Sequence, residues 1–215
     1  MSENLIFALW GIGGYLLGSI PFGLVLCYLA GYGDIRKIGS GNIGATNVLR
    51  TGNKWLALLT VILDASKAGI AAALAYHFVV SKPFIFAHFI TQLNIAVALF
   101  AGFMAVIGHN FPVWLKFKGG KGVASAFGFI LVMQPTLALI AALVWLVMAF
   151  TFKYSSLSAL TAAAIVPVAA FFLCDPVYTI CFTALALLVI LRHHANIARL
   201  IKGQESKISF KKGKK

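Results

Sequence analysis

Acidic side chains are scarce in this chain. Asp and Glu together number five among 215 residues, against eighteen Lys and Arg, so the formal net charge is +13. Too few carboxylates remain for the acidic metal-binding motif that a CDP-alcohol phosphotransferase requires. The cysteines lie in or beside apolar runs without metal-ligand spacing, and we expect them to be small buried hydrophobic residues: Cys27, Cys174 and Cys181. We therefore expect no metal site and no cofactor.

Charged residues of both signs make up only 11% of the chain, whereas hydrophobic residues make up 61%. This composition excludes an ordinary soluble protein. Long apolar runs alternate with short polar loops, so we expect one integral membrane domain over residues 1–215. The N-terminus lacks a basic region and a small-residue cleavage site, so we expect it to be retained. No aromatic residues interleave with the basic ones, so nucleic acid is not an expected partner.

Five apolar runs are long enough to hold membrane-spanning helices, since about 20 apolar residues cross the hydrocarbon layer. Two of these runs, 55–80 and 84–107, are separated by the turn Ser81-Lys82-Pro83. The other three are interrupted by Gly, Pro or Asp: 5–30 at residues 18–23, 123–152 at Gln134-Pro135, and 157–192 at Cys174-Asp175-Pro176.

The distribution of basic residues favours one topology. If runs 123–152 and 157–192 are both helical hairpins, seven spans leave only Lys82 outside and Lys67 within a span, with the other basic residues cytoplasmic. Five spans would also keep the C-terminus inside but would put Lys153 outside. The sequence therefore predicts an all-α integral membrane protein with seven transmembrane helices, an outer N-terminus and a cytoplasmic C-terminus. Both counts place the same three polar segments on the cytoplasmic face.

The first polar segment is GSGNIGATN, residues 39–47. Its three glycines permit positive φ and a close approach of the backbone to a ligand, and four of its side chains can hydrogen-bond. A plain interhelical turn would need only one or two glycines. Arg36 and Lys37, just before it, suit an anion or the positive-inside bias equally well.

The second polar segment is GHNFPVWLKFKGGKGVA, residues 108–124. Glycines surround Lys121 and lead directly into an apolar helix, so a phosphate can bind at the helix N-terminus. The segment does not match the nucleotide loop GxxxxGK[ST], because Val123 follows Gly122 and no strand precedes it. An ATPase is therefore not indicated. His109 belongs to this polar group.

The third polar segment is RHHANIARLIKGQE, residues 192–205. On a helix, His193, Asn196 and Leu200 share one face, and Arg192, Asn196 and Arg199 share an overlapping one. The alternative is an amphipathic helix end anchored by basic residues. His193 and His194 point about 100° apart on a helix and have no nearby Cys or Asp, so they do not indicate a metal site.

Two charged residues lie within an apolar run. Asp64 and Lys67 are three residues apart, so they can pair on one face of the second span. A structural ion pair inside the helix bundle is the simpler interpretation, and a role in shaping the site is the alternative.

In order along the chain, GSIPFG (18–23), GSGNIGATN, the Asp64–Lys67 pair, GHNFPVWLKFKGGKGVA and RHHANIARLIKGQE resemble the bacterial acyl-phosphate:glycerol-3-phosphate acyltransferases of the PlsY family. The resemblance covers the whole chain. Two positions depart from it: Ala195 stands where the family often has an acidic residue, and Gln204 where it often has Thr. Those positions are not carried over.

The resemblance implies transfer of a fatty acyl group from acyl phosphate to the 1-hydroxyl of sn-glycerol 3-phosphate, which gives lysophosphatidic acid and phosphate. It also implies a bacterial inner membrane location, an active site at the cytoplasmic face, and the lipid bilayer as partner. The enzyme that makes acyl phosphate is a further possible partner, although no residue identifies it. The resemblance implies three catalytic residues, which are Ser40, His193 and Asn196. The implied substrate-binding residues are Arg50, Gly108, Lys116 or Lys118, Gly119, Gly120, Lys121 and Gly122. Glu205 has an implied structural role, together with Asp64 and Lys67.

Three mechanisms are open. In the first, Ser40 is the nucleophile and forms an acyl-enzyme. In the second, His193 acts as general base and removes the proton of the glycerol hydroxyl. In the third, a substrate phosphate, with a second pKa of about 6, accepts that proton. We favour direct transfer, with Ser40 and Asn196 as hydrogen-bonding positioners and His193 as base or orienter. The HxxxxD arrangement of other glycerolipid acyltransferases is absent. A small transporter of a phosphorylated solute is the main rival, but we find no internal repeat and all polar segments lie at one face.

Overall fold

The computed structural model describes residues 1–86 and 88–208, and most of them are helical. The elements, in order, are α1 Glu3–Gly18, α2 Phe22–Leu29, η1 Ile35–Lys37, α3 Ala45–Val48, η2 Leu49–Thr51, α4 Lys54–Phe78, β1 Pro83–Phe86, β2 Phe89–Gln92, α5 Leu93–Asn110, η3 Val113–Leu115, α6 Val123–Met133, α7 Pro135–Phe152, α8 Ser155–Leu173, α9 Pro176–Arg192 and α10 His194–Ile201.

The expected class, an all-α integral membrane protein, is confirmed. Five helices are long and apolar enough to cross a membrane, and the bent pair α9 and α10 raises the number to six among the described residues. The long runs break where expected, since Pro135 begins α7 and Pro176 begins α9. Helix α6 has only 11 residues. The seven-span count and the orientation of the termini remain predictions.

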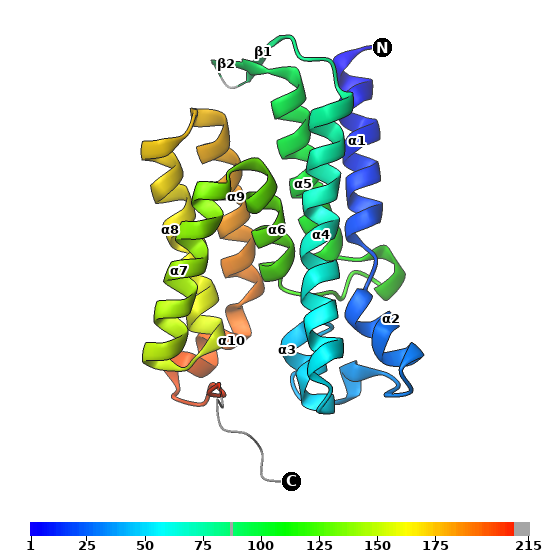
Figure 1. Cartoon of the computed structure of the whole chain (residues 1–215), viewed down its shortest axis with the longest axis vertical. Coiled ribbons are helices and arrows are strands. Elements are labelled where there is room, and N and C mark those ends of the chain that lie inside the picture. Colours follow the sequence, from blue (N-terminus) through cyan, green and yellow to red (C-terminus); the bar gives the residue numbers. More distant parts are fainter. Residues whose placement is uncertain (87, 209–215) are drawn as a thin grey trace.

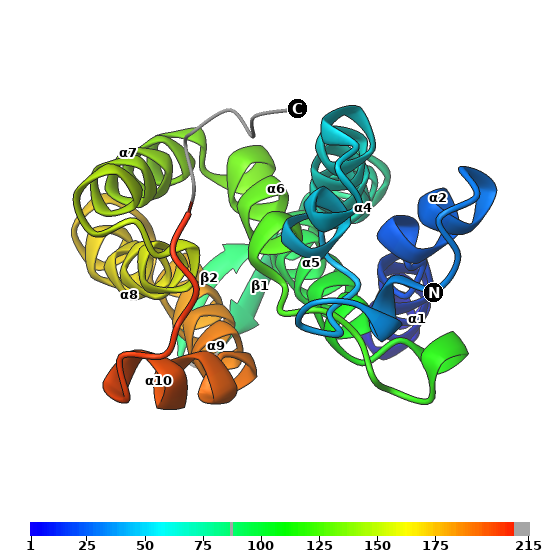
Figure 2. The ribbon, with the colours of Figure 1, turned by 90° about the horizontal axis from the view of Figure 1, so that it is seen from below.

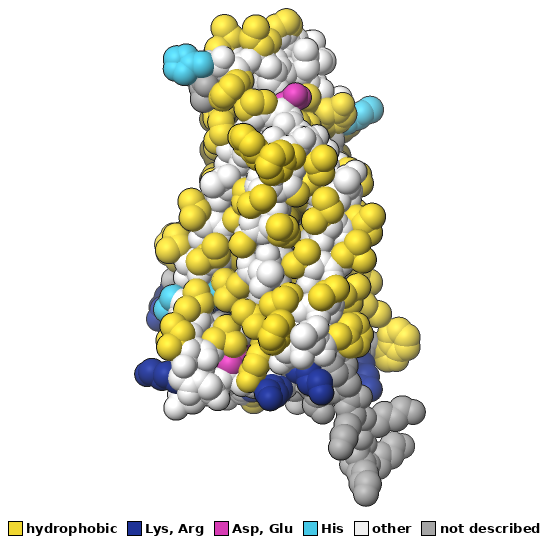
Figure 3. Space-filling view, turned by 90° about the vertical axis from the view of Figure 1, so that its left-hand side faces the viewer, with side chains coloured by type: hydrophobic (Ala, Val, Ile, Leu, Met, Phe, Trp, Pro, Cys, Tyr) yellow, Lys and Arg dark blue, Asp and Glu magenta, His cyan; other side chains and the backbone are white. Residues whose placement is uncertain are grey.

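The helices form two groups joined by α6 (Figures 1 and 2). Helices α1, α4 and α5 pack together on one side, and α7, α8 and α9 on the other, while α6 contacts α4, α5 and α7. The core is rich in alanine, and buried Phe129 of α6 meets Phe182 of α9 edge to face. The short helices α2, α3 and α10 lie at one end of the bundle, which is also where the Lys and Arg side chains gather in Figure 3.

Residues 83–92 correct one prediction. Instead of opening a membrane span, they form an antiparallel hairpin in which Pro83 pairs with Gln92 and Phe86 with Phe89. Its Phe, Ile and Thr residues favour strands, and hydropathy alone does not distinguish such a run from a helix. The amide of Leu93, the first residue of α5, donates to the Lys82 carbonyl oxygen at 2.8 Å and closes the hairpin. The hairpin lies at the end of the bundle opposite α10 (Figure 1).

Helices α1 and α5 approach each other closely because glycines lie at their contact. A Cβ atom at Gly14 would collide with the carbonyl oxygen of Ala101, and one at Gly18 with that of Ala105. Small residues of this kind allow helix backbones to pack tightly within a membrane. Gly13, the neighbour of Gly14, has open space where its Cβ would lie.

We therefore expect Gly14→Ala to lower the thermal unfolding temperature of the purified protein in detergent. Overpacking costs about 1–3 kcal/mol, which exceeds the gain of about 1 kcal/mol that alanine brings to a helix. Gly13→Ala is the matched control and should unfold at the same temperature or a higher one. Equal unfolding temperatures for the two variants would contradict this packing.

Candidate active site

The second polar segment folds back onto the end of α5. The amide of Gly119 donates to the Asn110 carbonyl oxygen at 3.2 Å, and that of Gly120 donates to the His109 carbonyl oxygen at 2.9 Å. Glycine is required at both positions, since a Cβ at Gly119 would collide with the His109 carbonyl oxygen and one at Gly120 with the His109 ring. Gly108 fits tightly in the same way, against the Tyr15 carbonyl oxygen.

The segment ends at the N-terminus of α6. Gly122 is the N-cap residue with φ of 79°, and it makes no side-chain capping bond. The first-turn amides of α6 and the Lys121 side chain next to them form the expected anion-binding arrangement. The Asn110 side chain lies beside Gly122, fully buried, and neither of its polar atoms has a hydrogen-bond partner among the described residues.

The third polar segment is not one continuous helix, which corrects the prediction for residues 192–205. Helix α9 ends at Arg192, α10 begins at His194, and the two are bent by 60°. His193 lies at the bend and is only 3% exposed. Its Nδ1 lies 2.7 Å from the Val189 carbonyl oxygen and so carries the donated proton, which leaves Nε2 of a neutral ring able to accept one.

The second and third segments meet directly. Lys121 Nζ donates to Asn196 Oδ1 at 2.5 Å. The Arg192 guanidinium donates to the carbonyl oxygens of Gly119 and Gly120 at 3.0–3.2 Å. These bonds hold the glycine loop against the bend between α9 and α10, although 71 residues of chain lie between Gly120 and Arg192.

Glu205 fixes Asn196 from the other side. Its carboxylate accepts from Asn196 Nδ2 at 2.6 Å, from Arg199 Nε at 2.6 Å and from Ser156 Oγ at 2.7 Å. Burial raises the pKa of Glu205, but these three donors outweigh burial and hold its pKa below the usual value. Burial lowers the pKa of Lys121, and the Glu205 carboxylate opposes that effect.

The first polar segment is ordered by Asn47. The Ser40 amide and hydroxyl both donate to Asn47 Oδ1, at 3.1 and 3.4 Å, and Asn47 Nδ2 donates to the Ile35 carbonyl oxygen at 2.7 Å. Gly39 has φ of 56°, and the Arg50 side chain lies where its Cβ would be. Ser40 and Arg50 are exposed. This segment lies at the same end of the bundle as α10 (Figure 1), but within residues 1–86 and 88–208 it makes no side-chain hydrogen bond to the other two segments.

A buried charged cluster lies behind the glycine loop. Lys67 Nζ donates to Asp64 Oδ1 and to the Ile20 carbonyl oxygen, both at 3.0 Å, and lies 2.8 Å from His109 Nδ1. Because an ammonium group only donates, His109 Nδ1 accepts, and Nε2 of the neutral ring carries the proton at the Gly120 side. The Asp64 carbonyl oxygen accepts from Ser125 Oγ of α6 at 2.7 Å.

The structure thus brings together Lys121, Asn196 and Glu205 as one network, with Gly119 and Gly120 beside it. Asp64 and Lys67 form the ion pair that their spacing allows. The side chains of Lys116 and Lys118 are exposed and make no hydrogen bond to any residue that the structure describes. Sequence reasoning missed the bonds of Arg192 and Ser156 and the place of His109 beside Lys67. In the sequence, only the basic or polar character of Arg192, Ser156 and His109 indicated that these residues could belong to the site.

Two solved structures share this fold. PlsY, described as an integral membrane glycerol 3-phosphate acyltransferase, superposes in its glycerol 3-phosphate form with a TM-score of 0.83 and 36% identity, over 94% of this chain and 96% of that chain. Its lysophosphatidic acid form gives a TM-score of 0.82 at 36% identity, over 94% and 95% of the two chains. The fold and the site therefore define an integral membrane acyltransferase.

The family follows from the sequence comparisons. Residues 8–203 match the family model for glycerol-3-phosphate acyltransferase, and the chain belongs to this family. A glycerol-3-phosphate acyltransferase of Mesorhizobium japonicum is 52% identical over 98% of this chain and 100% of its own length. One of Rhodospirillum rubrum is 53% identical over 97% of this chain and 94% of its own length. The resemblance inferred from the motifs is confirmed, and the transporter alternative is not supported.

Removing the charge of Lys67 should strongly destabilise the protein. We expect Lys67→Met to lower the free energy of unfolding by about 3–5 kcal/mol, because it leaves the Asp64 carboxylate buried without its partner. Denaturant unfolding in detergent measures this loss. The double variant Asp64→Asn/Lys67→Met removes both charges and should lose less than the single variant. A single variant as stable as the unaltered protein would show that the pair does not support the bundle.

The Glu205 network should make stability depend on pH. Since the pKa of Glu205 is lower in the folded protein, its contribution is complete above about pH 4.3. This contribution is lost as the pH falls through the lower, folded value. Thermal unfolding between about pH 7 and about pH 3 measures it. Glu205→Gln should be less stable than the unaltered protein at neutral pH and should approach it in acid; parallel curves would contradict the network.

Proposed function

We propose that this chain transfers a fatty acyl group from acyl phosphate to the 1-hydroxyl of sn-glycerol 3-phosphate, giving lysophosphatidic acid and inorganic phosphate. The contact between Lys121 and Asn196 carries the proposal, because it joins the glycine loop to the His193 bend in one place. PlsY has been solved in a glycerol 3-phosphate form and in a lysophosphatidic acid form, and these ligands correspond to one substrate and the product of this reaction.

The charges at the site suit two phosphorylated substrates. Lys121 and the first turn of α6 provide one cationic position, and Arg50 beside Gly39 provides another. Lys116 and Lys118 add exposed positive charge at the same loop. We assign all of these to the binding of substrate phosphates, together with the backbone of Gly119, Gly120 and Gly122 and the close packing of Gly108 that positions it.

Direct transfer is the mechanism that we propose. The glycerol hydroxyl oxygen attacks the acyl carbonyl carbon, the new ester bond forms, the bond to the phosphate oxygen breaks, and the hydroxyl proton passes to a base. His193 Nε2 is able to accept that proton, and a phosphate oxygen of the substrate is the alternative acceptor. Acyl phosphate is already activated, so the site needs mainly to position it and stabilise charge.

Ser40 acts in this mechanism as a positioning group. Its hydroxyl donates to Asn47 Oδ1, and no imidazole or carboxylate accepts from it among the described residues. A nucleophilic serine needs a base that can take its proton. Asn196, oriented by Glu205 and Lys121, is the second positioning group.

We further propose one acyltransferase domain over residues 1–215, in the bacterial inner membrane, with the site at the cytoplasmic face. The support is the gathering of Lys and Arg at the end of the bundle that carries α3 and α10 (Figure 3). Acyl phosphate is poorly soluble, so direct delivery by the enzyme that makes it is consistent with this placement.

The direct test supplies the purified protein with acyl phosphate and labelled glycerol 3-phosphate, without added nucleotide or metal. Labelled lysophosphatidic acid is the expected product, and its absence would overturn the proposed reaction.

Lys121→Met should reduce kcat/KM by about 10- to 100-fold, mainly through KM, since a charge-assisted hydrogen bond is lost. The control is Lys54→Met, an exposed lysine at the start of α4, which should leave kcat/KM unchanged.

The role of Ser40 has its own test. Incubation with radiolabelled acyl phosphate alone, followed by denaturation, should leave no covalent label on the protein. A labelled peptide containing Ser40 would replace direct transfer by an acyl-enzyme route.

A further inference from the structure

Large apolar side chains stand exposed on residues 113–118, the stretch between α5 and the glycines, which we call the aromatic loop. Val113, Trp114 and Phe117 are 39%, 63% and 59% exposed. Lys116 and Lys118 lie among them and are exposed as well. This part of the chain projects from the side of the bundle next to α1 and α2 (Figures 1 and 2). Such a surface matches a partner that offers both hydrocarbon and negative charge.

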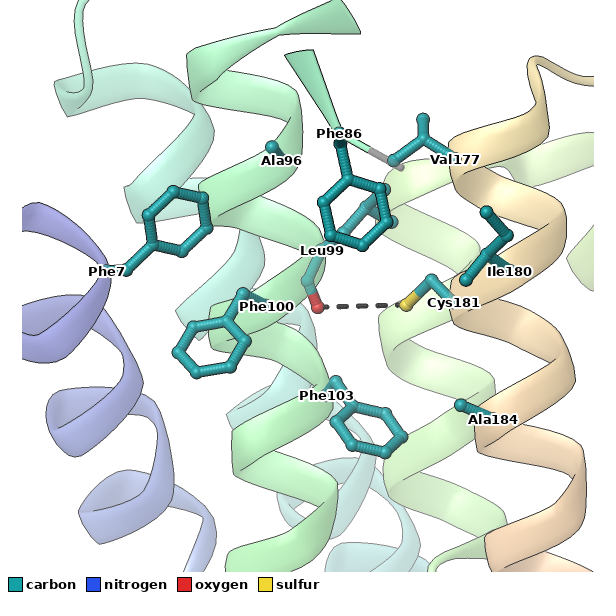
Figure 4. Close-up of a pocket in the computed structure, with 10 residues that line it drawn as sticks. All are labelled: Phe7, Phe86, Ala96, Leu99, Phe100, Phe103, Val177, Ile180, Cys181 and Ala184. Carbon is teal, nitrogen blue, oxygen red and sulfur yellow. Dashed lines mark hydrogen bonds between the residues drawn. The ribbon is translucent and has the colours of Figure 1, made fainter. Parts of the chain in front are cut away.

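The aromatic loop lies where a membrane span ends. Figure 4 shows the apolar middle of α5, where Phe100 and Phe103 line a hydrophobic cavity. Beyond Phe103 the next polar side chains on α5 are His109 and Asn110. The stretch long and apolar enough to cross a membrane ends at Leu115, within the aromatic loop. Aromatic and lysine side chains favour the boundary between hydrocarbon and water, so a bilayer surface is the partner that fits this position.

The backbone of the aromatic loop is strained but well bonded. Lys116 and Phe117 both have positive φ, of 50° and 62°, which residues other than glycine rarely adopt. The Phe117 amide donates to the Pro112 carbonyl oxygen at 3.0 Å, and the Lys118 amide donates to that of Leu115 at 3.1 Å. Strain of this kind is commonly kept at functional positions. Here it holds a bulky aromatic residue that remains exposed.

The aromatic loop is also fastened to the site. The glycine loop follows it directly in the chain, and the first polar segment contacts it from the other side. Leu115 packs against a buried cluster that includes Ile35 and Val48, which flank the segment that carries Ser40. The depth of the aromatic loop in a bilayer therefore determines the depth of both segments.

We propose that the aromatic loop anchors the active site at the surface of a leaflet that contains anionic lipid. Trp114 and Phe117 insert between the headgroups, and Lys116 and Lys118 bind the phosphate groups of the lipids. Acyl phosphate is itself an anionic lipid, so the anchor holds the site at the depth of its phosphate and adds to the substrate binding assigned to the two lysines. This consequence for acyl phosphate rests on the proposed acyl transfer, whereas the contact with lipid does not.

Fluorescence quenching tests the insertion of Trp114. The substitutions Trp10→Phe, Trp55→Phe and Trp145→Phe leave it as the single tryptophan of the chain. The variant is placed in nanodiscs whose phosphatidylcholine carries bromine either near the headgroup or near the chain end. Bromine near the headgroup should quench more strongly. Equal or weaker quenching from that position would overturn the insertion, and no quenching from either would overturn it in favour of a protein partner.

The same fluorescence tests the preference for anionic lipid. When only a minority of the lipid is brominated, brominated phosphatidylglycerol should quench Trp114 more than an equal amount of brominated phosphatidylcholine, because the lysines enrich it nearby. The added substitutions Lys116→Gln and Lys118→Gln should abolish this difference. Equal quenching by the two lipids before these substitutions would contradict the role of the lysines.

Phe117→Ala tests the consequence for activity. In nanodiscs of phosphatidylcholine and phosphatidylglycerol, loss of the apolar ring should raise KM for acyl phosphate about tenfold and change KM for glycerol 3-phosphate less than about twofold. In detergent micelles, which adapt to the protein surface, the increase should be much smaller. Phe117→Gly removes the same ring and relieves the positive φ, so it should give the same shift and unfold at the same temperature or a higher one.

Phe172→Ala is the matched control. Phe172 is 76% exposed near the C-terminal end of α8, away from the aromatic loop, and this variant should keep both KM values. An unchanged KM for acyl phosphate in Phe117→Ala, or an increase of equal size in nanodiscs and detergent, would overturn the anchoring role while leaving acyl transfer intact. No product from the unaltered enzyme would instead overturn acyl transfer and the consequence for acyl phosphate, and the quenching experiments would still decide the contact with lipid.

Discussion

The site depends on the hydrogen bonds of the buried Lys67 ammonium group. It is 1% exposed and binds Asp64 of α4, the Ile20 carbonyl oxygen at the break between α1 and α2, and His109 of α5. A charge inside a membrane protein is costly unless it is paired and hydrogen-bonded. The three acceptors are therefore held together, and the place of the His109 ring determines where the glycine loop can lie.

The glycine loop connects this buried cluster to the polar residues at the end of the bundle. A side chain larger than hydrogen at Gly119 or Gly120 would collide with His109, and the carbonyl oxygens of both glycines accept hydrogen bonds from the Arg192 guanidinium. Lys121 follows directly and reaches Asn196, which Glu205 holds in place. A buried interior thus supports polar groups at one end of the bundle, while large apolar side chains are exposed along its length. This division suits a reaction between a lipid and a water-soluble phosphate.

The sequence predicted the parts of this arrangement that are local. The helix breaks at Pro135 and Pro176, the glycine loop before α6 and the spacing of Asp64 and Lys67 can all be read from short segments. The hairpin was missed because its aromatic and β-branched residues are as hydrophobic as a membrane helix. The bend at His193 and the bonds of Arg192 and His109 depend on residues far apart in the chain, and no periodicity reports such contacts. The roles of Ser40, His193 and Arg50 remain predictions.

The position of bound glycerol 3-phosphate in a crystal structure of this chain tests the central claim most directly. The claim is that one site is formed where the glycine loop meets the bend between α9 and α10, with Ser40 at the same end. We predict that Lys121, Arg50 or the first-turn amides of α6 bind the phosphate, with the 1-hydroxyl directed toward His193. A phosphate bound at the hairpin end, or one without contact to any of these groups, would contradict the account.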